Sequence, residues 1–244
     1  EHVKINDQKS SSWLENEINE LEKLDKLEIK TRTSVAAYHG YNYLLARENL
    51  TDHLSQNEKH NKVRQRLLKI RAKKVIVATG SLERPLVFNN NDRPGIMLSS
   101  AVKKYADYYG VATGKKNIFF TNNDTAYESA ISLNTKGIKV EAIIDIREQS
   151  NTAFTKEAEG LGIKVYRSHT VVNTEGYKKI NNITIMKLSR DGQSFASPEK
   201  IELDCDCLAI AGGWTPAVHL FTQSGGKLKF REKDQVFIPD IYPS

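Results

Sequence analysis

The chain has 244 residues, and its 36 Lys and Arg against 30 Asp and Glu give a formal net charge of +6. With 39% hydrophobic and 27% charged residues it has the composition of a globular protein, which excludes long disordered or collagen-like segments. No apolar run approaches the roughly 20 residues of a membrane span, the first residues lack the apolar core of a signal peptide, and the lysines are scattered among acids. We therefore expect a cytoplasmic protein of one or two domains that binds neither a membrane nor nucleic acid.

The first predicted element is an amphipathic helix over residues 12–27. Its apolar residues recur at helical spacing, at Leu14, Ile18, Leu21 and Leu24. Ser12 and Glu15 have the spacing of a capping box at the start of the helix. We expect the apolar face of this helix to pack inward.

Three strands and an apolar run follow the helix. The strands are predicted over residues 33–39, 41–50 and 64–70. Local turns would join them into an antiparallel β meander, with the polar residues 51–61 as a long hairpin loop. The run 74–81 predicts a strand buried on both faces, and Gly80 near its end would let a ligand approach the backbone closely.

The rest of the chain predicts alternating helices and strands. Helices are predicted over residues 99–109, 125–134 and 156–161, and Gly110 ends the first of them. Strands are predicted over residues 117–120, 140–145, 164–166, 169–173, 180–188, 200–203 and 206–213. The strand, helix and strand between residues 117 and 145 form a βαβ unit, so the fold class is α/β and Rossmann-like.

This βαβ unit lacks the glycine loop of a dinucleotide site. The motif Gly-x-Gly-x-x-Gly lets a pyrophosphate reach the helix N-terminus, and it occurs nowhere in the chain. Its place is held by Thr121, Asn122, Asn123, Asp124, Thr125 and Ala126. Side chains here would crowd a pyrophosphate and Asp124 would repel it, so we expect a unit that has lost, or never had, dinucleotide binding. Asp145, at the position of a ribose-binding acid, carries little weight without the glycines.

The two cysteines, Cys205 and Cys207, are two residues apart, where strand alternation would put both side chains on one face. Two thiols cannot complete a zinc site, and these lack the Cys-x-x-Cys spacing of a redox pair. The chain also has no Gly-x-Ser-x-Gly nucleophile elbow. The sequence therefore predicts strand packing for the cysteines, no metal site, no catalytic triad and no thiol chemistry.

Three blocks of sequence carry a resemblance to a known family. They are residues 71–97, which contain Ala78-Thr79-Gly80, residues 120–127 and residues 211–228. They resemble the alpha subunit of heterotetrameric sarcosine oxidase, and the first and third blocks also resemble subunits of opine dehydrogenases and hydrogen cyanide synthase. The resemblance implies a fold like that of the pyridine nucleotide-disulfide oxidoreductases, with two dinucleotide-binding domains of the FAD/NAD(P) type.

The resemblance also implies a domain order. Residues 1–87 would be part of the first dinucleotide-binding domain, residues 88–206 an inserted second domain, and residues 207–244 the return to the first. The fold would be incomplete at both ends, as an internal segment, with the glycine loop upstream of Glu1 and a tetrahydrofolate-binding domain beyond Ser244.

The implied function is oxidative demethylation of sarcosine to glycine, with formation of hydrogen peroxide and transfer of the one-carbon unit to tetrahydrofolate. In such a complex the alpha subunit carries NAD, FAD and FMN belong to the wider assembly, and the partners are the beta, gamma and delta subunits. Carried over by motif, the NAD-contacting residues would be Ser34, Val35, Thr79, Gly80, Arg84 and Gly213. The catalytic residues would lie on another subunit.

Three alternatives stay open at this point. The chain could belong to a related opine or amine dehydrogenase or to a hydrogen cyanide synthase-like complex. It could also be a structural assembly module that binds no nucleotide. Arg84, directly before Pro85, is equally compatible with a surface ion pair.

Overall fold

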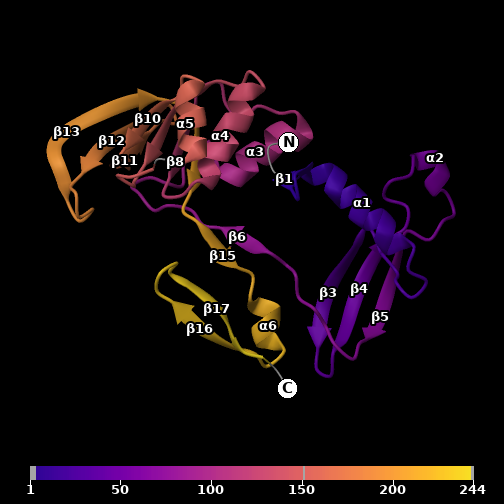
Figure 1. Cartoon of the computed structure of the whole chain (residues 1–244). Coiled ribbons are helices and arrows are strands. Elements are labelled where there is room, and N and C mark those ends of the chain that lie inside the picture. The colour runs from indigo at the N-terminus through magenta and orange to yellow at the C-terminus, as the bar shows by residue number, and fades with distance from the viewer. Residues whose placement is uncertain (1–3, 151, 243–244) are drawn as a thin grey trace. The chain divides into compact units, whose positions relative to one another are not determined.

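The structure is a computed structural model that describes residues 4–150 and 152–242 (Figure 1). The described residues form two compact units. The first unit runs to Ala78 and also includes Val218–Lys229 and the segment from Pro239, and the second unit comprises Thr79–Ala217 and Phe230–Ile238. Within the described ranges, no helix is long and apolar enough to cross a membrane.

The first unit begins with a short hairpin and a helix. The hairpin pairs β1 (Lys4–Ile5) with β2 (Gln8–Lys9), and α1 (Ser10–Glu22) follows directly. The predicted helix is present, but it begins earlier and ends earlier than expected. The capping box predicted at Ser12 is wrong, because Lys9 is the residue at the N-cap and no side chain caps the helix.

The apolar face of α1 does not pack inward as expected. None of its residues is buried, and Leu14 is 52% exposed. Helical spacing creates an apolar stripe, but only a neighbouring element can cover it. The prediction that this helix packs inward is therefore wrong, because no described part of the chain buries its apolar face.

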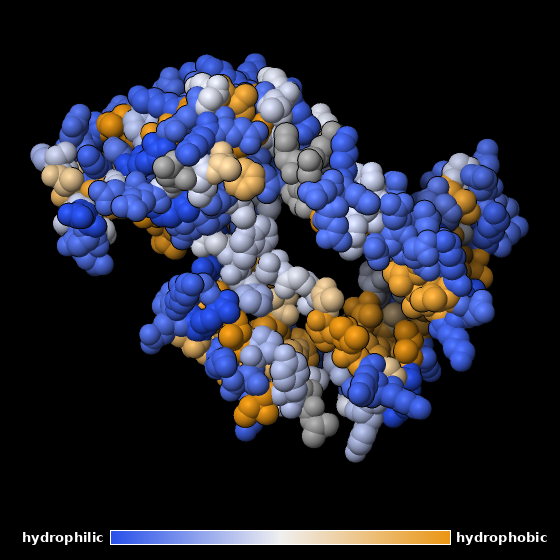
Figure 2. Space-filling view, viewed as in Figure 1, coloured by the Kyte–Doolittle hydropathy of each residue, from blue (hydrophilic) through white to orange (hydrophobic). Residues whose placement is uncertain are grey.

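The predicted β meander is confirmed. Its strands are β3 (Thr33–His39), β4 (Tyr43–Asn49) and β5 (Gln65–Arg71), which pair antiparallel in that order. Apolar side chains are exposed on this sheet (Figure 2), among them Val35 and Leu67. The loop between β4 and β5 contains a one-turn helix, α2 (Gln56–Lys59), which starts with a capping box of Ser55 and Glu58.

The strand predicted over residues 74–81 is wrong. Residues 74–80 have no strand assignment, and Ile76 is 92% exposed. A buried strand needs neighbours on both sides to bond its backbone groups, and no described strand pairs with this run. Regular structure resumes at β6 (Ser81–Glu83), which pairs antiparallel with β15 (Trp214–Pro216) as a short ribbon.

A five-stranded parallel sheet forms the centre of the second unit. Its strands are β7 (Ile96–Leu98), β8 (Asn117–Thr121), β9 (Val140–Asp145), β10 (Lys164–Arg167) and β14 (Cys207–Ala211). They lie in the order β10-β9-β8-β14-β7, and every neighbouring pair is parallel. This arrangement is the expected Rossmann-like α/β fold.

Two different layers cover the parallel sheet (Figure 1). Helices α3 (Ser99–Tyr109), α4 (Thr125–Thr135) and α5 (Ala153–Gly160) share one buried cluster with it. The antiparallel strands β11 (His169–Glu175), β12 (Asn182–Leu188) and β13 (Phe195–Asp204) share the other. Alternate residues of β8 supply both clusters, with Phe119 in the first and Phe120 in the second.

Both cysteines are buried, but the prediction that they share one face of a strand is wrong. Cys205 lies between β13 and β14 and packs in the cluster under the antiparallel sheet, whereas Cys207 packs in the helix-covered cluster. The chain passes from one sheet to the next between them, so strand alternation does not relate the two side chains. Burial raises the pKa of the Cys205 thiol to about 12 and also raises the pKa of Cys207.

The C-terminal part adds small elements that the sequence patterns did not predict. They are α6 (His219–Gln223) and the two-stranded sheet of β16 (Lys227–Arg231) and β17 (Val236–Ile241).

Candidate functional site

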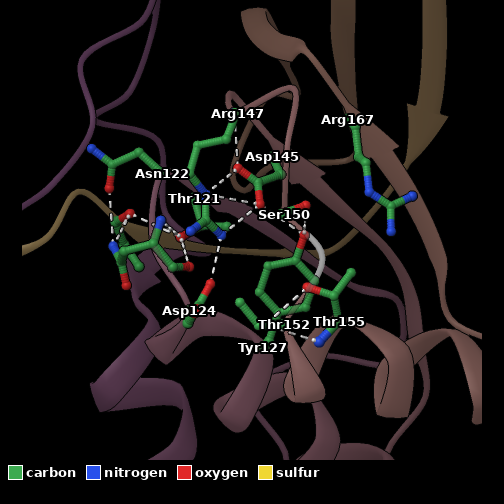
Figure 3. A network of polar contacts seen from close by, with 12 residues as sticks. Thr121, Asn122, Asp124, Tyr127, Asp145, Arg147, Ser150, Thr152, Thr155 and Arg167 are labelled. Carbon is green, nitrogen blue, oxygen red and sulfur yellow. Dashed lines mark hydrogen bonds and ion pairs between the residues drawn. The ribbon is translucent and has the colours of Figure 1, made fainter.

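The candidate site lies at the carboxyl ends of β8, β9 and β14, beside the start of α4 (Figure 3). In open α/β sheets, ligands bind at this edge, and a dinucleotide places its pyrophosphate at the N-terminus of the helix in the first βαβ unit. In this chain that helix is α4. The loop between β8 and α4 is therefore the segment whose contacts decide what this edge can bind.

The loop between β8 and α4 is tied to itself and to β14. The Thr121 hydroxyl donates to the Asn123 carbonyl (2.9 Å) and accepts the Asn123 backbone N–H (3.0 Å). The side-chain amide of Asn123 donates to the Ala211 carbonyl (3.1 Å). Its oxygen accepts from the Thr125 backbone N–H (3.0 Å) and hydroxyl (2.6 Å). Asn123 thus bonds an N–H at the helix start, where a bound pyrophosphate would otherwise accept hydrogen bonds.

A partly buried ionic cluster lies next to this loop. The Asp145 side chain is fully buried, and its Oδ2 accepts from Arg147 Nη2 (2.8 Å) and the Tyr127 hydroxyl (2.8 Å). The other oxygen, Oδ1, accepts from the backbone N–H (2.9 Å) and Nε (3.1 Å) of Arg147. Arg147 Nη2 also donates to Asp124 Oδ1 (2.8 Å), which joins the loop before α4 to the end of β9. Figure 3 shows Arg147 between the two carboxylates.

The surroundings hold Arg147 and Tyr127 in their protonated forms. Burial alone would lower the pKa of Arg147, but its hydrogen bonds to Asp145 and Asp124 raise it. The pKa of Tyr127 is raised, first by burial and also by the nearby Asp145. Arg147 and Tyr127 therefore act as hydrogen-bonding supports and do not exchange protons near neutral pH.

Sequence reasoning identified the loop and Asp145 but missed Arg147. Asp145 stands where a ribose-binding acid would lie, yet its carboxylate is bonded by residues of this chain. A usable signal was present, because the arginine follows two residues after the aspartate, just beyond the end of the strand.

The residues predicted to contact NAD fall into two groups. Four lie on the β6–β15 ribbon or beside it in the second unit, namely Thr79, Gly80, Arg84 and Gly213. The Thr79 hydroxyl and the Gly80 carbonyl bond the backbone of Ala217 (3.3 and 3.0 Å), and the Arg84 N–H donates to the Gly213 carbonyl (2.8 Å). The other two, Ser34 and Val35, are exposed on β3 of the first unit. The structure brings the first four together, and the role of all six in binding NAD stays a prediction.

Arg84 supports the backbone around the ribbon. Its Nη1 donates to the Gln235 carbonyl (3.0 Å) and its Nη2 to the Asp234 carbonyl (3.3 Å). A Cβ on Gly213, whose φ is +96°, would lie 3.1 Å from Arg84 Nη2. Arg84 therefore bonds carbonyl groups, and no ion pair of this side chain is found among the described residues.

The described residues contain no group of three or more His, Cys, Asp or Glu side chains that could hold a metal ion. The site has two parts. At the carboxyl edge of the parallel sheet, side chains of this chain occupy the space, whereas the β6–β15 ribbon is flanked by glycines and open to solvent. Gly80 has a φ of +72° and nothing within 4 Å of the place of a Cβ. The ribbon thus offers backbone that a ligand can approach closely.

Comparison with curated proteins finds clear relatives. The chain is 37% identical over 238 residues to sarcosine oxidase subunit alpha of Corynebacterium sp. (strain P-1), which is 97% of this chain and 24% of that protein. The chain is homologous to part of sarcosine oxidase subunit alpha. The corresponding subunit of Rhizobium meliloti (strain 1021) is 34% identical over 220 residues, 90% of this chain and 21% of that protein. The chain thus spans about a quarter of the length of these sarcosine oxidase subunits, and no family model matches it.

Solved structures confirm the fold. The L-proline dehydrogenase of P. horikoshii matches 96% of this chain and 37% of its own, with a TM-score of 0.58 and 23% identity. The thioredoxin reductase of T. acidophilum matches 74% of this chain and 60% of its own, with a TM-score of 0.53 and 20% identity. At such identities the similarity shows the fold alone. This fold is Rossmann-like, as the sequence resemblance implied.

Proposed function

We propose that this chain is part of the alpha subunit of a sarcosine oxidase. The whole enzyme would oxidise sarcosine to glycine, form hydrogen peroxide and transfer the one-carbon unit to tetrahydrofolate. The observation that carries the proposal is the 37% identity to a sarcosine oxidase alpha subunit across 97% of the chain. Because the match covers 24% of that subunit, the substrate, the reaction and the partners all belong to the proposal.

Within such an enzyme we assign this chain a binding and supporting role. The edge of the parallel sheet argues against a second bound nucleotide, since the Asn123 side chain accepts from the Thr125 N–H at the helix start and Arg147 engages Asp145. Both cysteines are buried with raised pKa values, which argues against thiol chemistry. The oxidation would take place on another subunit.

The proposed NAD contacts are the six residues carried over by motif. Gly80 supports this assignment best, because its backbone is open and a Cβ is absent there. Thr79, directly before Gly80, would also lie next to the nucleotide. Arg84 and Gly213, whose backbones bond each other, would form one side of the nucleotide site. Ser34 and Val35 would meet the adenine edge. The proposed domains are residues 1–87 and 207–244 for the NAD-carrying domain and residues 88–206 for the inserted one.

The wider assembly is proposed on the same ground. A protein named as an alpha subunit works in a complex, so beta, gamma and delta partners are expected, with FAD and FMN bound outside this chain. Tetrahydrofolate would bind another part of the alpha subunit. We propose a cytoplasmic location for the complex.

The test is sarcosine-dependent formation of hydrogen peroxide by the complex that copurifies with the full-length gene product. Proline and an opine serve as alternative substrates, and the cofactors released on denaturation are identified. Activity on sarcosine together with released NAD and flavin would support the proposal. Activity on proline or an opine alone would move the function to a related dehydrogenase, and absence of both activity and NAD would favour a structural assembly module.

A further inference from the structure

A basic hollow of about 650 Å³ lies in the first unit, between the ends of β4 and β5 and the loop that joins them. Four cationic side chains line it, Arg47, Lys59, Lys62 and Arg64. Asp52 is the one acidic residue in the lining. In Figure 2 the region around α2 is mainly hydrophilic. The four cations come from a strand, a one-turn helix and the segment before the next strand, so the fold itself gathers them.

The acidic groups of this region have partners outside the four cations. Asp52 Oδ1 lies 3.3 Å from Arg32 Nε. Glu58 accepts from the backbone N–H (2.9 Å) and the hydroxyl (2.6 Å) of Ser55 as part of the capping box. Glu48 lies within ion-pair distance of Lys30 and Arg66, at 3.7 and 3.5 Å. Asp52 and Glu48 therefore pair with cations outside the hollow, and Glu58 is held by the neutral groups of Ser55.

The four cationic side chains that line the hollow have no such partner. Across the described residues, no carboxylate lies within ion-pair distance of Arg47, Lys59, Lys62 or Arg64. Lys59 is half-buried, so part of its side chain lies against the protein. Four positive charges against one negative charge give the lining +3, and like charges gathered around one concavity raise the local positive potential.

We propose that this hollow binds a small anion that carries two or more phosphoryl groups. The guanidinium forks of Arg47 and Arg64 suit the bidentate geometry of phosphoryl oxygens, and Lys59 and Lys62 add compact charges. The side-chain amides of Asn49 and Gln65 bond each other (3.0 Å) and extend the polar wall. A hollow of this volume is within the usual range for small-molecule sites, about 300–1,000 Å³. The site uses none of the residues assigned to NAD and is independent of the proposed function.

The test is calorimetric titration of the full-length gene product with inorganic pyrophosphate at about 0.15 M ionic strength, where charges more than about 8 Å apart are largely screened. The variant Arg47→Gln/Arg64→Gln should weaken binding by about tenfold or more, because two charge-assisted contacts are lost. The matched control Lys69→Gln/Lys73→Gln removes two exposed charges of the same unit outside the hollow, and it should change the affinity by less than about twofold at this ionic strength. Lys62→Gln is a second, single-site variant at an exposed position in case the double variant misfolds.

Three results would overturn the proposal. Absence of pyrophosphate binding at millimolar concentration would show that the hollow is no site. If the hollow variant and the control variant weaken pyrophosphate binding equally, the loss of affinity reflects the overall charge of the protein and not the hollow. Citrate binding as tightly as pyrophosphate would remove the preference for phosphoryl groups.

Discussion

Replacing Arg147 by methionine should destabilise the second unit by about 3 kcal/mol, near the low end of the roughly 3–5 kcal/mol that loss of one partner from a buried ion pair costs. The reason is Asp145, whose side chain is fully buried and would be left without its counterion. The expected cost lies at the low end because the Arg147 side chain is 30% exposed, so water can enter its place. The Tyr127 hydroxyl and the backbone N–H of residue 147 would also remain bonded to the carboxylate.

The assay is hydrogen exchange, followed by mass spectrometry, in the full-length gene product. A loss of about 3 kcal/mol corresponds to roughly hundredfold faster exchange in peptides from β8, α4 and β9, if they open together. Arg167→Met is the matched control, because Arg167 and Glu159 pair at 2.7 Å with both side chains partly exposed. Such a surface pair contributes up to about 1 kcal/mol.

A second variant separates lost charge from lost packing. Asp145→Asn combined with Arg147→Met removes both charges, so exchange should slow again toward the rate of the unmodified protein. If Arg147→Met is as mild as Arg167→Met, or if the double variant is no better than the single one, the buried pair does not support this edge of the sheet.

Gly80→Ala should lower the amount of NAD released from the denatured complex, whereas Gly192→Ala should not. Both glycines have a positive φ (+72° and +68°) and open space at the Cβ position, so backbone strain is matched and equal NAD contents would contradict the assigned role of Gly80. Although burial alone would raise the pKa of Asp107, hydrogen bonds from Lys136 and Ser132 hold it below its usual value of 3.8. The stability from this group is therefore present above pH 3.8 and is lost as the pH falls through the lower pKa of the folded state. Melting curves of Asp107→Asn should lie below those of the unmodified protein at pH 7 and converge with them in acid, and a constant offset would refute this assignment. Cys205 and Cys207 should react with a disulfide reagent at pH 8 only after unfolding, because both are buried and the pKa of Cys205 is raised to about 12. Peptide mapping after labelling checks this, and rapid labelling of the folded protein would contradict it.

Elements with strong local signals were predictable from the sequence. The helix expected over residues 99–109 has those bounds, because its spacing is helical and Gly110 ends it at a φ of +64°. The strand over residues 33–39 also has its expected bounds, and the βαβ unit from residue 117 is present. The absence of a glycine loop after β8 was also evident from the sequence, because residues 121–126 carry side chains where such a loop would bind a pyrophosphate.

Signals that depend on distant neighbours were misread. The run 74–81 has a composition typical of a buried strand, yet a strand forms only where another strand can bond its backbone, and no described strand does so. The apolar stripe of α1 likewise predicts burial without saying what covers it. The contact of Arg147 with Asp124 was not foreseen, because it joins residues 23 positions apart.

The sequence by itself determined the α/β class, the antiparallel meander and the absence of a glycine loop, since spacing, turn residues and motifs are local properties of the chain. The tertiary structure decided which segments meet. It places β14, from late in the chain, between β8 and β7, and this placement brings Ala211 to Asn123. It also pairs β15, which follows Gly213, with β6. It also gathers four cations around one hollow. Local patterns report whether a residue suits burial or a turn, but backbone pairing and charge pairing depend on residues that only folding brings together.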